Sequence, residues 1–186
     1  MRENRSPWDS HCWFEPDLHD CSVRLRRTFT LVAGLDNGVT NVVAGDYHTC
    51  ALVFGGVQCW GDGNDGILGN GDTSDSAVPV QVVGLSANVT DLAAGGLHTC
   101  AAVKGGVRCW GAPTYGDLGG SIPAGSSETT VQVTGLTADV LNIAVGDVHS
   151  CACLAIGVKC WGESGSGQLG DDTFLAQDGP VWVKFP

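Results

Sequence analysis

The sequence predicts an all-β fold, and three observations lead to this prediction. The chain of 186 residues contains 28 glycines, roughly twice the average share, which indicates many turns. Apolar residues make up 43% of the chain, yet no run approaches the roughly 18 apolar residues of a membrane-spanning helix. A Cys-Trp-Gly motif recurs at a period of 50 or 51 residues, which is typical of propeller blades. These features predict a partial β-propeller of about three four-stranded antiparallel blades.

The repeat divides the chain into predicted domains. Aligned on their cysteines, the three repeats or blades span residues 35–84, 85–135 and 136–186. Between Leu35–Gly61 and Leu85–Gly111, 16 of 27 positions are identical. Residues 1–34 do not follow the pattern, and we expect a degenerate blade remnant or an irregular N-terminal segment there.

Each repeat predicts four short strands. In the first repeat these are Val39–Ala44, His48–Val53, Gly56–Gly61 and Val78–Val83. Pro79 in the last of them is compatible with an edge strand. Loops rich in Gly, Asp, Asn and Ser separate the third and fourth strands, so they predict irregular surface rather than helix. The loops are Asp62–Ala77, Ala112–Thr130 and Glu163–Gly179.

The hairpin between the second and third strands predicts a disulfide. If Cys50 faces Cys59, then Val53 faces Gly56 and a two-residue turn remains between them. Alternation makes the cysteines a non-hydrogen-bonded pair with Cα atoms about 4.5 Å apart, within the disulfide range. The same spacing predicts three disulfides: Cys50 with Cys59, Cys100 with Cys109, and Cys151 with Cys160. Reduced thiols and a zinc site remain as alternatives.

Two further residue types recur and predict the blade framework. Period two places His48 on the face of Cys50, and places Trp60 on the opposite face. No nucleophile or carboxylate repeats beside the histidines, so we interpret them as hydrogen-bonding residues rather than catalytic bases. The tryptophans are expected to fill the space between neighbouring blades. The framework set is His48, His98, His149, Trp60, Trp110 and Trp161.

The sequence predicts no catalytic, cofactor-binding or metal site and hence no enzyme. It lacks a Ser/His/Asp arrangement, a metal-ligand cluster and a phosphate-binding loop. The acidic loop of the first repeat suggests a calcium site made of Asp62, Asn64, Asp65 and Asp72. The second repeat lacks most of these oxygen ligands, so we interpret the acidic residues as ones that form hydrogen bonds within turns. Nine cysteines leave at least one unpaired within the chain, and Cys153 is a candidate free or intermolecular thiol. The pairing of Cys12 and Cys21 is open.

The charge distribution excludes some partners. The net charge of −11 belongs to residues 35–186, because residues 1–34 hold five acidic and five basic side chains. Such an acidic chain repels phosphate, which argues against nucleic acid and anionic membranes as partners.

Three motifs recur in the same order in each repeat: Gly-x-x-His-[Thr/Ser]-Cys-Ala, Val-x-Cys-Trp-Gly and Gly-x-Leu-Gly. The last stands at Gly66–Gly69, Gly116–Gly119 and Gly167–Gly170. Residues 35–186 therefore resemble the regulator of chromosome condensation repeat family. The resemblance implies a propeller of about seven four-stranded blades around a channel. The paired cysteines resemble the extracellular bacterial branch of the family.

The resemblance and the variable loops together favour a non-catalytic scaffold that binds a protein or glycan partner. The resemblance also leaves two alternatives, a guanine-nucleotide exchange regulator of a small GTPase and a secreted enzyme inhibitor. We expect an extracellular or cell-surface location from the cysteines, although Met1–Pro16 has no apolar signal-peptide core. The paired cysteines and the missing signal peptide are compatible if the chain is a fragment that lacks its export signal. The alternative is a cytoplasmic protein whose cysteines stay reduced. Self-association that completes a ring is a further expectation.

Overall fold

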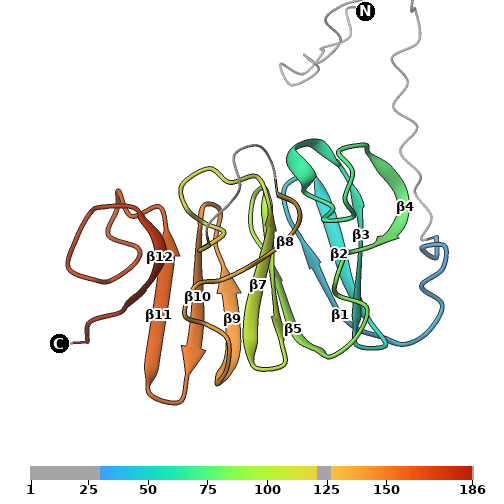
Figure 1. The fold of residues 1–186 in the computed structure, drawn as a ribbon. Helices are drawn as coiled ribbons and strands as arrows, with labels where there is room; N and C mark the ends of the chain where they lie inside the picture. The colour runs from blue at the N-terminus through green and yellow to red at the C-terminus, as the bar shows by residue number, and fades with distance from the viewer. Residues whose placement is uncertain (1–29, 121–126, 186) are drawn as a thin grey trace, which may run out of the picture. The chain divides into compact units, whose positions relative to one another are not determined.

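The computed structural model describes residues 30–120 and 127–185, which form three four-stranded antiparallel sheets (Figure 1). In each sheet the strands pair in chain order. The predicted blade remnant falls mainly within residues 1–29, which lie outside the described residues, as do Cys12 and Cys21. The all-β prediction and the partial propeller of four-stranded blades are confirmed, and the helical structure within the described ranges is one short 3₁₀ turn, η1 at Asn64–Gly66.

Every strand of the three sheets is six residues long. The first sheet contains β1 Val39–Ala44, β2 His48–Val53, β3 Gly56–Gly61 and β4 Ser76–Gln81. The second contains β5 Val89–Ala94, β6 His98–Val103, β7 Gly106–Gly111 and β8 Ser127–Gln132. The third contains β9 Val140–Val145, β10 His149–Leu154, β11 Gly157–Gly162 and β12 Gln177–Trp182.

The central hairpins have the predicted register. Val53 pairs with Gly56, and the turn residues Phe54 and Gly55 have φ values of 50° and 77°. Two consecutive left-handed residues fit the right-handed twist of a hairpin, and Lys104-Gly105 repeats this turn with φ values of 52° and 78°. The third hairpin has the non-glycine turn Ala155-Ile156, and its positive φ falls instead on Gly157, at 145°.

The fourth strand differs from the prediction. We expected Val78–Val83, whereas β4 begins two residues earlier, at Ser76, which pairs with Gly61. The register then shifts, so that Cys59 pairs with Val80. This irregularity at an edge strand brings the polar Ser76 into the ladder, which the apolar pattern alone does not indicate.

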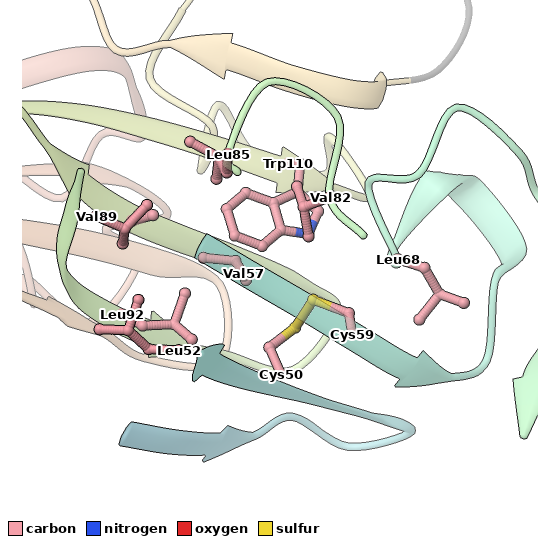
Figure 2. Packing of buried hydrophobic residues seen from close by; sticks show 11 residues of the cluster. Cys50, Leu52, Val57, Cys59, Leu68, Val82, Leu85, Val89, Leu92 and Trp110 are labelled. Atoms are coloured by element: carbon pink, nitrogen blue, oxygen red, sulfur yellow. A yellow bond between two sulfur atoms is a disulfide. The ribbon is translucent and has the colours of Figure 1, made fainter. Parts of the chain in front are cut away.

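The core consists of two equivalent clusters, each formed where two neighbouring sheets pack. Figure 2 shows the first cluster, in which the Cys50–Cys59 disulfide and Val57 of the first sheet lie near Trp110 of the second. The second cluster repeats these positions with Cys100, Cys109, Val107 and Trp161. The strands β1, β5 and β9 also contact one another in turn. The repeat therefore dictates the same interface twice.

Candidate functional site

The three predicted disulfides are present. Their Cα–Cα distances are 4.0 Å for Cys50–Cys59 and 4.1 Å for both Cys100–Cys109 and Cys151–Cys160. Each bond joins directly opposite residues of one hairpin, which is the short cross-strand separation of a non-hydrogen-bonded pair. Among the described cysteines Cys153 is free and exposed.

Each sheet has two faces with different chemistry. We call the face that bears the disulfide the forward face, and the face that bears the tryptophan the rear face. Trp110 and Trp161 are fully buried on the rear faces of the second and third sheets. Their rings lie against Gly69 and Gly119, where an added Cβ would come within 2.7 Å of the indole atoms. The rear face of the first sheet is open among the described residues, and Trp60 there is only half-buried.

The histidines lie on the forward faces and bind hydroxyl groups of the following sheet. His48 Nε2 is 2.7 Å from Thr99 Oγ1, and His98 Nε2 is 2.9 Å from Ser150 Oγ. Both hydroxyl groups belong to the residue that follows the next histidine in the repeat. The histidines thus serve as polar connections within apolar interfaces. His149 is half-buried on the open forward face of the third sheet.

The second interface contains a buried acid that the sequence did not point to. Asp117 occupies the variable position of Gly-x-Leu-Gly, and its side chain is 1% exposed. Its carbonyl oxygen accepts hydrogen bonds from Trp161 Nε1 at 2.8 Å and from Ser150 Oγ at 3.2 Å. Its Oδ2 accepts a bond from Thr114 Oγ1 at 3.0 Å. Since Ser150 uses its hydrogen on this carbonyl, His98 Nε2 donates to Ser150.

Burial shifts the two titratable groups of this interface toward their uncharged forms. Desolvation, followed by repulsion from His48 and His149, lowers the pKa of His98 to about 4. Desolvation raises the pKa of Asp117, in spite of the Thr114 hydrogen bond. His98 Nδ1 is 3.6 Å from Asp117 Oδ2, which is within ion-pair distance, but the low pKa of His98 leaves its imidazole uncharged at neutral pH, so the contact is not an ion pair there.

One edge of the sheets carries the variable loops, and we call it the loop edge. It comprises the turns after β1, β5 and β9 and the described parts of the loops after β3, β7 and β11 (Figure 1). Each loop is tied to the neighbouring turn by one repeated hydrogen bond, donated by Asp62, Ala112 and Glu163 to residues Tyr47, Leu97 and Val148. Neighbouring turns are linked as well, because Asp46 N donates to Gly96 O at 3.1 Å and Gly96 N to Asp147 O at 3.2 Å.

The acidic loop of the first sheet is held by turn hydrogen bonds. Asp62 Oδ1 accepts from the backbone N–H of Asn64 at 2.9 Å, and Asp72 Oδ1 accepts from Thr73 and Ser74. These are the local bonds that Asp makes in turns. Within residues 30–120 and 127–185 no group of three or more His, Cys, Asp or Glu side chains is arranged to hold a metal ion. In the same ranges no helix has the length and apolar character needed to cross a membrane.

Antiparallel four-stranded sheets that repeat along the chain and pack face to face define a segment of a β-propeller. Within residues 39–117 the repeats match those of the regulator of chromosome condensation family. A family profile described as "Regulator of chromosome condensation (RCC1) repeat" matches residues 55–102. A second profile with this description matches residues 39–67 and 89–117. No curated protein sequence matches the chain significantly.

Solved structures show the same fold. Human WBSCR16 is 26% identical and superimposes with a TM-score of 0.70, covering 80% of this chain and 38% of its own. Yeast RCC1 (Prp20) in its complex with Kap60 is 19% identical, with a TM-score of 0.69 and coverage of 80% and 37%. Prp20p of Saccharomyces cerevisiae, studied with its binding to Gsp1p and histones, is 18% identical, with a TM-score of 0.70 and coverage of 80% and 39%. The chain therefore spans less than two fifths of each of these structures.

Proposed function

We propose that this protein is a non-catalytic interaction module whose loop edge binds a protein partner with a basic surface. The observation that carries the proposal is the contrast between a framework whose key positions recur in every sheet and loops that differ between sheets. The two core clusters occupy equivalent positions, whereas the loops around the Gly-x-Leu-Gly motif vary in sequence between the repeats. A constant scaffold with variable loops is the usual arrangement for recognition.

The loop edge exposes large apolar side chains that the framework does not need. Tyr47 is 67% exposed in the turn after β1, Tyr115 is 51% exposed in the loop after β7, and Phe174 is 71% exposed in the loop after β11. Exposed aromatic side chains are enriched at protein interfaces, because they offer a large contact area at a low entropic cost. The three come from three different sheets, so a partner that contacts them engages the whole described segment.

The charge of the loop edge favours a basic partner. Its acidic residues include Asp46, Asp62, Asp65, Asp72, Asp75, Asp147, Glu163 and Asp172. The basic side chains of residues 35–186 are few: Lys104 lies at the opposite edge, and Arg108 and Lys159 lie within β7 and β11. Lys184 contacts Asp172 at 3.2 Å. Complementary charge steers association and selects partners. Protein partners are also what the yeast structures report: Kap60 in one, and Gsp1p and histones in the other.

The cysteines support an extracellular or cell-surface site of action. The described residues contain three disulfides, and two of them, Cys50–Cys59 and Cys100–Cys109, are buried in the inter-sheet core clusters. Disulfides of this kind persist in oxidising compartments. A partner of this module would therefore be met outside the cytoplasm.

The test compares which proteins are captured by the wild-type chain and by two triple variants. In the loop-edge variant Tyr47, Tyr115 and Phe174 are replaced by Ser, and in the control variant Phe54, Leu141 and Ile156, which are exposed near the opposite edge, are replaced by Ser. We expect proteins that bind the wild-type chain and the control variant, are basic, and are lost from the loop-edge variant in quantitative mass spectrometry. Equal capture by all three proteins, or capture only of acidic proteins or glycans, would overturn the proposal.

A further inference from the structure

A polar cavity of about 460 Å³ lies where the first and second sheets are joined, at the edge of the hairpin turns opposite the loop edge (Figure 1). Its walls come from the connection between β4 and β5, the turn between β6 and β7, and the strands β7 and β8. We propose that this cavity binds a small hydroxylated carboxylate, such as a sugar acid. The site is separate from the loop edge, and it is independent of the partner proposed there.

The cavity collects positive charge in an acidic chain. Residues 35–186 contain four basic side chains, and two of them, Lys104 and Arg108, line this cavity. The other two make contacts elsewhere: Lys159, the equivalent of Arg108 in the third sheet, lies over the Trp182 ring at 4.8 Å, and Lys184 contacts Asp172 at 3.2 Å. None of the described residues that line the cavity is acidic. An anionic ligand would therefore meet two cations and no lining carboxylate here.

The equivalent positions of the other two sheets have a different charge pattern. Phe54 stands in the first sheet where the second has Lys104. Acids stand where the second sheet has neutral polar residues, with Asp36 at the position of Ser86 and Asp139 at that of Asn88. The hairpin turn does not require the lysine, because Phe54 and Lys104 adopt φ values of 50° and 52° in the same turn. The basic side chain is therefore available for binding rather than needed for folding.

Hydrogen bonds hold the two cationic walls in place. Arg108 is half-buried in β7, and its Nη1 donates to Thr130 Oγ1 of β8 at 3.2 Å. The turn that carries Lys104 is tied to the connection on the other side of the cavity, because Lys104 N–H donates to the Asn88 carbonyl at 3.3 Å. An arginine fixed in this way loses less conformational freedom when it binds an anion.

The lining residues indicate which anion fits. Guanidinium and ammonium groups both pair with carboxylates. The Ser86 and Thr137 hydroxyl groups and the Asn88 amide offer hydrogen bonds to hydroxyl groups of a ligand. None of the described lining residues is aromatic, so a flat stacking ligand such as a nucleobase is not favoured. The net charge of −11 opposes polyanions, and a volume of about 460 Å³ suits a small molecule, so a singly charged hydroxylated carboxylate satisfies all these conditions.

The experiment is a titration of the isotope-labelled full chain with sodium D-glucuronate, followed by NMR at low ionic strength. D-Glucose is the uncharged control with the same sugar ring, and inorganic sulfate is the control for charge alone. Arg108→Gln and Lys104→Ala introduce the residues that other repeats carry at these positions, Gln58 and Ala155, so both variants are expected to fold. Lys159→Gln is the matched control, since it removes the equivalent charge of the third sheet.

We expect glucuronate to bind with a dissociation constant of about 1 mM or tighter and to shift the amide signals of Ser86, Asn88 and Lys104. Arg108→Gln and Lys104→Ala should each weaken binding at least about tenfold, whereas Lys159→Gln should bind as the wild-type chain does. Added salt should also weaken binding, because it screens the charges. If either variant does not fold, Ser86→Asp takes its place, since it adds the acid of the first repeat at an exposed position and should weaken binding as well.

Four results would each overturn the proposal. Glucuronate leaves the three amide signals unshifted, or D-glucose or sulfate binds as tightly as glucuronate does. Lys159→Gln loses as much affinity as Arg108→Gln, which would place the ligand outside this cavity. An oligomer of galacturonate binds more tightly than the monosaccharide, which would make the ligand a polyanionic glycan rather than a small molecule.

Discussion

Replacing the three equivalent tryptophans by alanine tests whether the rear faces determine stability. A fully buried tryptophan removes about 150–250 Å² from water, and its loss with the resulting cavity costs about 4 kcal/mol. We expect about this loss for Trp110→Ala, whose indole is fully buried. Trp161→Ala should cost about 1 kcal/mol more, because Trp161 Nε1 also donates to Asp117 O at 2.8 Å. Trp60→Ala should cost about 1–2 kcal/mol, since this side chain is half-buried on an open face.

The assay is urea unfolding followed by far-ultraviolet circular dichroism, with disulfides intact and protein at low micromolar concentration. The slope of the transition must stay constant between variants, so that midpoints report stability. Trp110→Phe and Trp161→Phe separate packing from hydrogen bonding, because only the second replacement removes a bond. If Trp60→Ala is as costly as Trp110→Ala under these dilute conditions, our assignment of open and closed faces is wrong.

Two further predictions concern pH and glycine. Because the folded-state pKa of His98 lies at about 4, below its ordinary 6.5, its stability contribution is present above pH 6.5 and is lost as pH falls toward 4. The wild-type chain should lose up to about 3 kcal/mol of unfolding free energy over this pH window. In urea titrations at a series of pH values, His98→Gln should flatten the plot of unfolding free energy against pH. A plot that His98→Gln leaves unchanged would exclude His98 as the cause. Gly69→Ala should cost about 3 kcal/mol in the same assay, because φ is +63° and the new Cβ would lie 2.7 Å from the Trp110 ring. Gly84 also has a positive φ (+80°), but a Cβ added there would have Thr130 Oγ1 as its nearest neighbour, at 3.7 Å, so Gly84→Ala should cost about 1 kcal/mol. Equal losses of unfolding free energy in Gly69→Ala and Gly84→Ala would contradict the role of the Trp110 contact.

The sequence was sufficient for features that depend on local periodicity. The hairpin register follows from the nine-residue spacing of Cys50 and Cys59, since one pairing fixes all others in an antiparallel ladder. The faces of His48 and Trp60 follow from the same alternation. The start of β4 at Ser76 was missed, because its pairing with Gly61 depends on a register shift and not on apolar character.

The contacts between sheets were not predictable from a single repeat. Period two indicates which face His98 shares with Cys100, but not that Ser150 of the next sheet accepts its hydrogen bond. Asp117 stands in a loop rich in turn residues, at a position occupied by Ile67 and Gln168 in the other repeats, so no repeated residue type indicated that an acid would be buried there. Asp117 is buried because the third sheet packs against it, with Trp161 and Ser150 donating hydrogen bonds to its carbonyl oxygen.

The placement of the disulfides has a consequence for the history of the chain. Each of the three described bonds closes within one hairpin of one sheet, across nine positions of sequence. A duplicated or deleted repeat therefore carries or removes both of its hairpin cysteines together, and leaves neither without its mate. The number of blades can change by recombination without any reassignment of these covalent pairs. Such a cross-link stabilises a single blade while leaving the copy number of blades free to evolve.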